Sequence, residues 1–467
     1  MADEVTTELK GSWWRPETPT RRVAGTLTIS YPLELRLDGA LIEDPPATPG
    51  TFISFPNDTA DRADVVLGVT VSGDKVTVFD SWGGSFGMPS EIVQNELWRP
   101  RVALIGDHFN RDVRFDEVWM TTEYLWDWSG APRHRTNFDS GTGELQILAN
   151  RQSLMKAVVA GTRYELLSDF RTSPSDRSGI TLEDDVTWHV RPSESLTWYA
   201  IVDDVVVPLQ ALATFCTMHS NRVARLEIRP VGATRTVRVV TWLRGSDLPE
   251  RDLKSLPPQV QVLPGWYFFP RSNRILRNWF RIRGDLDAVL NRLLSVDYAA
   301  SMYLEHRSAS IIQAAEALHR AQWDRTRLSK KEHKIRRKAV MAAVADELRP
   351  WLSSQITGRN DLSLRERITD VVERAERAGL PYDVTSRDDF VQAVLRSRNT
   401  GAHGSSGGAD FEEQYWRASG LAWLIRTLLL SELGLTSDEI FELLSGNEEL
   451  RFCARRLSWS RLSVART

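Results

Sequence analysis

The chain has 467 residues, of which 42% are hydrophobic and 26% are charged, and its formal net charge is −3. This composition excludes a disordered, collagen-like or fibrous protein and predicts two or three soluble domains. Lys and Arg outnumber Asp and Glu from Ser272 onward, so the C-terminal part is the one better suited to meet phosphate.

Only two cysteines occur, Cys216 and Cys453, and they lie far apart in the sequence. Their number and spacing predict neither a disulfide framework nor a zinc site, and they suit a reducing compartment. The first residues lack the basic and apolar segments of a signal peptide, and no stretch approaches the roughly 18 apolar residues of a membrane span. We therefore expect a cytoplasmic protein with no membrane partner, no metal and no other cofactor.

The first predicted domain, residues 1–252, consists of short alternating runs rich in Val, Ile, Thr and Trp. This pattern indicates antiparallel strands with one wet face. A run at 33–37 leads into Asp38-Gly39, and a run at 69–79 is interrupted by Ser72-Gly73-Asp74, so both predict hairpins. Helical spacing from Asp203 to Met218 predicts one helix packed on the sheets.

Residues 253–273 are rich in Pro and are predicted to be a linker to a helical domain at 274–467. Helices are predicted at 285–323, 330–349, 363–378, 386–403, 410–433 and 437–444. Four capping boxes support them: Ser329 with Glu332, Ser363 with Glu366, Ser386 with Asp389, and Thr436 with Glu439. The apolar stretch Leu421–Leu430 predicts a buried central helix. The predicted fold class is α+β, an antiparallel β-sandwich-like region followed by an all-α bundle.

The candidate for chemistry is the stretch from Arg396 to His403, where a predicted helix runs into a Gly/Ser loop. Histidine can move the protons of a ribose 2′-hydroxyl or a leaving 5′-oxygen, and an arginine fork can stabilise phosphate charge without a metal. On an ideal helix Arg396 lies about 20° from His403 and Arg398 about 140°, which favours Arg396 unless Gly401 changes the geometry. Cations near a helix end also complement the helix dipole, and chemistry alone favours that structural role.

Arg398-Asn399-Thr400-Gly401-Ala402-His403 resembles the Arg-Asn-x-x-x-His signature of HEPN domains. The run from Ala314 to Arg320 resembles the Ala-x-Glu-x-x-His-Arg run of the ApeA-like HEPN branch, and the stretch from Gly11 to Gly39 is similar to the ApeA N-terminal domain. The resemblance covers most of the chain, in the same domain order. It implies a prokaryotic anti-phage defence protein with a metal-independent endoribonuclease that cleaves RNA, tRNA among the candidates, and causes abortive infection.

The resemblance also implies roles for individual residues. Arg398 is the phosphate-binding residue, His403 the acid/base and Asn399 the residue that orients the site, with a 2′,3′-cyclic phosphate as product. Glu316 is expected to hold the Arg or the His in place. Arg396 satisfies a looser form of the motif, so the choice of arginine stays open. The Arg and His of two protomers are expected to meet in a homodimer, restrained or triggered through the β-rich domain by an unknown infection signal.

A basic run around His333 predicts an RNA-binding track or, equally, a solvated helix face. Its Lys and Arg residues are Lys330, Lys331, Lys334, Arg336, Arg337 and Lys338. His319 is expected to be a surface or packing residue, and the pairs Asp184-Asp185 and Asp203-Asp204 are expected in turns. Two other functions remain open: a non-catalytic RNA- or protein-binding protein whose helical bundle only dimerises, and a carbohydrate-binding module.

Overall fold

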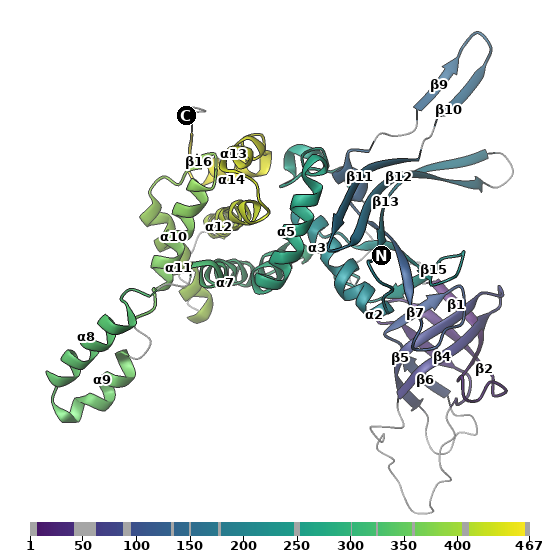
Figure 1. Ribbon diagram of the computed structural model, residues 1–467, viewed down its shortest axis with the longest axis horizontal. Helices are drawn as coiled ribbons and strands as arrows, with labels where there is room; N and C mark the ends of the chain where they lie inside the picture. The colour runs from purple at the N-terminus through teal and green to yellow at the C-terminus, as the bar shows by residue number, and fades with distance from the viewer. Residues whose placement is uncertain are drawn as a thin grey trace, which may run out of the picture. The chain divides into compact units, whose positions relative to one another are not determined.

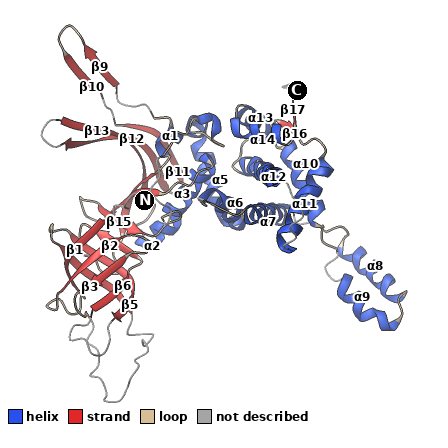
Figure 2. Ribbon diagram, turned by 180° about the vertical axis from the view of Figure 1, so that it is seen from behind, coloured by secondary structure: helices blue, strands red, loops and turns tan. Residues whose placement is uncertain are grey.

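The computed structural model describes residues 7–41, 62–86, 95–131, 135–148, 151–175, 179–246, 253–299, 301–323, 326–356, 360–403 and 411–462. At 398–403 it describes the helical backbone without the side chains. The chain divides into two compact units, one of residues 1–213 and 220–256, the other of residues 214–219 and 257–467. The long strands lie in the first unit and most helices in the second, which confirms the α+β class (Figure 2).

Six strands of the first unit close into a barrel. They are β1 (Thr7–Trp14), β2 (Val23–Ile29), β3 (Glu34–Leu37), β4 (Arg62–Thr70), β5 (Lys75–Phe86) and β6 (Asn95–Arg99). Their order is β5-β4-β1-β2-β3-β6, and pairing of β6 with β5 completes the ring. The fully buried Trp13 and Trp98 fill its interior. Gly68 makes room for Trp13, because a Cβ there would lie 2.3 Å from the indole ring.

An open antiparallel sheet continues from β5 of the barrel. In spatial order its strands are β7 (Val102–Ile105), β15 (Val237–Thr241), β14 (Val223–Pro230), β8 (Phe115–Thr122), β13 (Gly179–Arg191), β12 (Thr162–Ser175) and β11 (Gln152–Val159). The 72–74 hairpin is confirmed, since Val69 pairs with Lys75. The hairpin at Asp38-Gly39 is wrong, because β3 pairs with β2 before it and with β6, instead of with the next strand.

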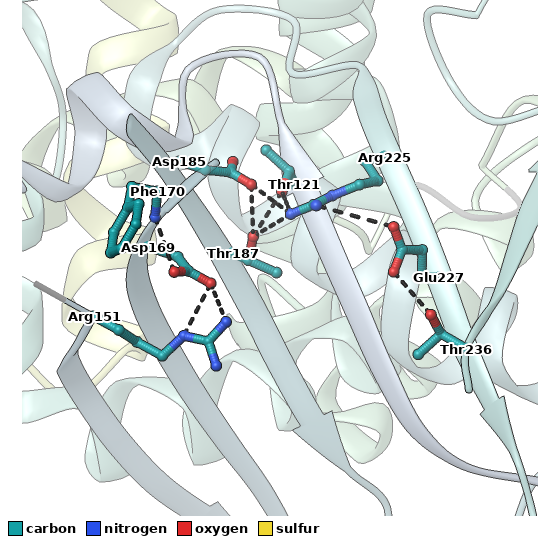
Figure 3. Close-up of polar contacts among 9 residues, drawn as sticks. All are labelled: Thr121, Arg151, Asp169, Phe170, Asp185, Thr187, Arg225, Glu227 and Thr236. Atoms are coloured by element: carbon teal, nitrogen blue, oxygen red, sulfur yellow. Dashed lines mark hydrogen bonds and ion pairs between the residues drawn. The ribbon is translucent and has the colours of Figure 1, made fainter. Parts of the chain in front are cut away.

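The pair Asp184-Asp185 lies within β13, so its expected place in a turn is wrong. Arg225 on β14 donates hydrogen bonds to the Asp185 carboxylate and, at 2.7 Å, to the Thr187 hydroxyl (Figure 3). Alternate residues of an antiparallel sheet face water, where carboxylates on one strand can pair with arginines of another. Asp185 thus belongs to a cross-strand polar network.

The helix predicted at 203–218 is confirmed as one continuous element. It comprises α2 (Trp198–Ile201), a π-helical turn (Val202–Val206) and α3 (Val207–Thr217). Asp203 and Asp204 lie in the π-helical turn, so their expected place in a chain turn is wrong. By length and composition this helix could cross a membrane, which the sequence analysis did not expect. However, 72% of its apolar window is buried, as in a core helix.

The second unit is a bundle of helices. They are α4 (Gly265–Phe268), α5 (Ser272–Asp285), α6 (Asp287–Tyr298), α7 (Leu304–Trp323), α8 (Lys330–Ala342), α9 (Arg349–Ile356), α10 (Leu364–Arg377), α11 (Arg387–His403), α12 (Phe411–Glu432), α13 (Ser437–Ser445) and α14 (Glu448–Arg456). Within the expected linker, Leu263 and Phe268 are buried. The single helix predicted at 285–323 is wrong, because α6 ends at Tyr298 and Ala299 is extended.

Three of the four capping boxes are confirmed by reciprocal hydrogen bonds, those at Ser329, Ser363 and Thr436. The box at Ser386 is wrong: its φ of 52° is left-handed, whereas the other three caps have negative φ. The helix predicted at 330–349 ends at Ala342, and Arg349 Nε donates a 3.0 Å hydrogen bond back to the carbonyl oxygen of Met341.

The predicted central helix is confirmed as α12, which is buried throughout Leu421–Leu430. One of these residues is charged. Arg426 donates two hydrogen bonds of 2.8 Å to the carboxylate of Asp297 on α6, and the two side chains are 6% and 7% exposed. Burial raises the pKa of Asp297, and the charge of Arg426 opposes that shift. This ion pair fixes α12 against α6.

We expect Asp297→Asn to lower the free energy of unfolding by about 3–5 kcal/mol, because it leaves Arg426 buried without a counter-charge. The double variant Asp297→Leu with Arg426→Met should unfold close to wild type, since it removes both charges. Urea unfolding followed by circular dichroism measures both. A single variant within about 1 kcal/mol of wild type would contradict this account.

Candidate active site and nucleic-acid interface

The helix α11 carries the whole predicted catalytic motif and is anchored through its N-terminal half. Phe390, Val391 and Val394 are buried, and the Phe390 ring packs edge-on against Trp459 with centroids 5.7 Å apart. At the helix start, Arg387 donates a 2.7 Å hydrogen bond to Glu376 of α10. The motif therefore lies at the C-terminal end of a helix whose N-terminal half is packed into the bundle.

The backbone of α11 stays helical through Gly401 and ends at His403. Ideal helix geometry therefore applies, and the positions of Arg396 and His403 lie two turns apart on one side. Position 398 instead lies on the side of the helix that carries the buried Val391, two turns earlier. The Arg396 side chain is exposed, while the side chains of Arg398, Asn399 and His403 lie outside the described residues. Within one chain, position 396 rather than 398 shares the side of His403.

The acidic residue predicted to support the site, Glu316, is half-buried on α7. Its carboxylate accepts a 2.9 Å hydrogen bond from Arg320, one turn later on the same helix. This contact orients Glu316 along the surface of α7. The predicted role of holding the catalytic Arg or His remains a prediction.

His319, three residues after Glu316, is a packing residue. It is 1% exposed, and its Nε2 lies 3.0 Å from Oδ2 of Asp370 on α10. Arg374 donates a 3.0 Å hydrogen bond to the same oxygen and lies over the Trp323 ring. Asp370 and Arg374 are not predicted from the sequence. Their i,i+4 spacing signals a pair, but only the tertiary structure shows that the pair binds α7.

The basic run lies on an arm formed by α8 and α9, which projects from the helical bundle (Figure 1). Neither helix, both of them fully described, buries a side chain. Lys330, Lys331, Lys334, Arg336, Arg337 and Lys338 are all exposed. The arm is joined to the bundle at its root, where Asn360 exchanges hydrogen bonds with the backbone of Leu328. The structure thus leaves this surface open to a polyanion.

No group of three or more His, Cys, Asp or Glu side chains among the described residues is arranged to hold a metal ion. Both cysteines are buried, and neither forms a disulfide. Burial raises the pKa of the Cys453 thiol to about 12, so this thiol is a poor nucleophile at neutral pH.

Two family models match the chain. One, ApeA N-terminal domain 1, matches residues 8–230, and the other, Apea-like HEPN, matches residues 309–439. The chain has the ApeA-type architecture. The two matches cover about three quarters of it, and the HEPN match includes all of α11 and the basic arm. No curated protein and no solved structure matches. HEPN domains are generally ribonucleases, so RNA is the substrate class that the ApeA-like HEPN domain indicates.

The stability of the root of the arm is expected to depend on pH through Glu366. Hydrogen bonds from Arg327 and from the Ser363 hydroxyl lower the pKa of Glu366 to about 2. A carboxylate whose folded pKa is lowered stabilises the fold above its ordinary pKa of 4.5, and this contribution disappears as the pH falls toward 2. Glu366→Gln should therefore unfold at a lower temperature than wild type at pH 7.

The difference in melting temperature between Glu366→Gln and wild type should shrink as the pH falls from 5 to 3. The exposed Glu347→Gln on the same arm is the control, and it should follow wild type at each pH. A difference of equal size at pH 7 and pH 3 would mean that the Glu366 carboxylate charge does not hold the root.

Proposed function

We propose that this protein is a cytoplasmic anti-phage defence protein whose HEPN domain is a metal-independent endoribonuclease, active as a homodimer, and that the ApeA N-terminal domain controls it. The observation that carries the proposal is the position of the Arg-Asn-x-x-x-His signature. It lies on one unbroken helix, α11, within the region that matches Apea-like HEPN. Transfer RNA is among the candidate substrates, and cleavage on infection gives abortive infection.

The proposed reaction needs one proton carrier and one cation. His403 removes the proton of a ribose 2′-hydroxyl, the 2′-oxygen bonds to phosphorus, and the bond from phosphorus to the 5′-oxygen breaks. A proton returned to that 5′-oxygen completes the step, which leaves a 2′,3′-cyclic phosphate and a 5′-hydroxyl. Arg398 binds the non-bridging phosphate oxygens, where negative charge builds up, and Asn399 orients the site.

The helix geometry supports a site shared by two protomers. Position 398 lies on another side of α11 from position 403, so one helix does not present the two residues together. In the proposed dimer, Arg398 of one protomer serves His403 of the other. The alternative is a site within each chain, formed by Arg396 and His403.

Mixed dimers distinguish these two arrangements. An Arg398→Ala chain paired with a His403→Ala chain has one shared site with both wild-type residues and one with neither. We expect such dimers, purified with two affinity tags, to recover about half of the wild-type activity, although each variant alone is inactive. If Arg398→Ala alone keeps its activity and Arg396→Ala abolishes cleavage, the site lies within one chain.

The catalytic role of His403 is tested on total cellular RNA in the presence of EDTA. We expect His403→Ala to cleave at least about 100-fold more slowly than wild type, since general acid–base catalysis contributes at least that factor. Arg451→Gln, an exposed change on α14, is the control and should cleave normally. Both variants must elute as the same oligomer as wild type.

If the wild-type protein does not cleave RNA in this assay, the same comparison is made in extract from phage-infected cells, where a trigger is present. Equal cleavage by wild type and His403→Ala contradicts catalysis by this residue. Silence of both proteins in infected extract, combined with intact RNA binding, favours the non-catalytic binding function.

The exposed basic arm supports a role in holding the RNA backbone. Lysine and arginine bound to phosphates release counterions, so RNA affinity should depend steeply on salt. The neutral variant Lys330→Gln with Lys334→Gln should weaken RNA binding in fluorescence anisotropy at low salt and approach wild type at high salt. Equal affinity of the two proteins at low salt would assign the run to a solvated helix face.

A further inference from the structure

An open hollow of about 450 Å³ lies in the helical unit between the end of α6, the start of α7 and the first turns of α12. Its lining includes one cation, Arg307, and two aromatic side chains, Phe411 and Tyr415. Val296 and Met302 add apolar surface. No motif or spacing in the sequence singles out Arg307.

Arg307 is a half-buried arginine whose charge the fold does not neutralise locally. Its guanidinium lies over the Tyr415 ring, 5.0 Å from the centroid. Its Nε is buried and has no hydrogen-bond partner among the described residues. Burial also lowers the pKa of Arg307. A buried N–H group without an acceptor raises the free energy of the empty site, and an anion that accepts a hydrogen bond from it removes that cost.

The neighbouring carboxylates are already paired with other arginines. Asp297 attracts Arg307 electrostatically, but both of its oxygens accept hydrogen bonds from Arg426. Glu412, at the edge of the hollow, forms a 3.0 Å ion pair with Arg456. Neither carboxylate forms a hydrogen bond or ion pair with Arg307 among the described residues, so its guanidinium can meet an anionic ligand.

The aromatic side chains narrow the class of anion. Phe411 and Tyr415 are 70% and 39% exposed, and they lie one turn apart on α12. Exposed aromatic rings beside an arginine form the usual surface for single-stranded nucleic acid, because bases stack on the rings while the cation binds phosphate. A purely inorganic anion would gain nothing from the two rings.

We propose that this hollow binds one nucleotide of the RNA substrate, with a phosphate on Arg307 and the base on Phe411 or Tyr415. The inference rests on the proposed ribonuclease function. Phe411 follows His403 by eight residues, which span at most about 29 Å, so the two positions lie within that distance of each other. A short stretch of RNA reaches from one to the other.

The test uses the full chain carrying His403→Ala, so that RNA is not cut, and a fluorescein-labelled single-stranded oligoribonucleotide. Anisotropy is measured over a range of salt concentrations. We expect Arg307→Gln to weaken binding about tenfold and to reduce the slope of log affinity against log salt by about 0.7, the value for one phosphate contact on a single strand. Arg307→Lys should keep the slope.

The aromatic variants should behave differently. Phe411→Ala with Tyr415→Ala should weaken binding about tenfold and leave the salt slope unchanged, because stacking releases no counterions. The exposed Arg277→Gln on α5 is the matched control and should change neither quantity. Melting temperatures of all variants verify that they fold.

Three results would overturn the inference. In the first, Arg307→Gln folds but binds RNA with the affinity and salt slope of its parent. In the second, the parent binds no RNA. In the third, Arg307→Gln changes the mass measured by sedimentation without RNA, which assigns the hollow to an interface between copies. Cleavage by the chain with intact His403 is scored separately. RNA binding that depends on Arg307, without cleavage even in extract from infected cells, overturns the nuclease proposal alone, whereas cleavage without that dependence overturns only the nucleotide site.

Discussion

The pairing of Arg426 with Asp297 is the electrostatic constraint on the buried core of the helical unit. The helix α12 is apolar on nearly all sides and must be covered all round, so α7, α10, α11 and α14 pack against it. A charge in the middle of such a helix is tolerated only with a counter-charge, and α6 supplies it. The position of α6 in turn determines where α7, the next helix in the chain, begins.

The same constraint produces the charge of the hollow. Two arginines, Arg307 and Arg426, lie near one buried carboxylate, and the geometry gives both oxygens of that carboxylate to Arg426. Arg307 therefore keeps its charge at the surface of the bundle. An interaction that stabilises the core thus leaves an adjacent cation available for a ligand, which links the packing of α12 to the nucleic-acid chemistry proposed for its first turns.

Much of this architecture is predictable from local sequence. The caps at Ser329, Ser363 and Thr436 satisfy backbone groups within one turn, so their spacing alone identifies three helix starts. The α11 motif and the apolar α12 are local as well. The break after Tyr298 was missed because helical periodicity continues on both sides of it, and the failed cap at Ser386 depends on a backbone angle that composition does not encode.

Contacts between distant segments account for the other errors. No spacing reveals that Asp185 faces Arg225 or that Asp370 binds His319, because their partners lie 40 and 51 residues away. Arg307 could not be predicted for the same reason. Its importance depends on Asp297, whose two carboxylate oxygens accept hydrogen bonds from Arg426 and not from Arg307. Sequence therefore identified the candidate chemistry of α11, which is a local motif, but not the hollow beside α12, which exists only after three helices have packed.

The helical continuity of α11 bears on how the proposed nuclease is restrained. Because α11 is helical through Gly401, positions 398 and 403 lie on different sides of it. Local geometry within a single chain therefore does not bring that pair to one phosphate. A site completed by a second protomer needs the correct approach of two bundles, and any element that alters this approach changes the activity without touching a catalytic residue. If the protein is the homodimeric nuclease proposed above, control by the N-terminal domain requires only a shift in the arrangement of that dimer.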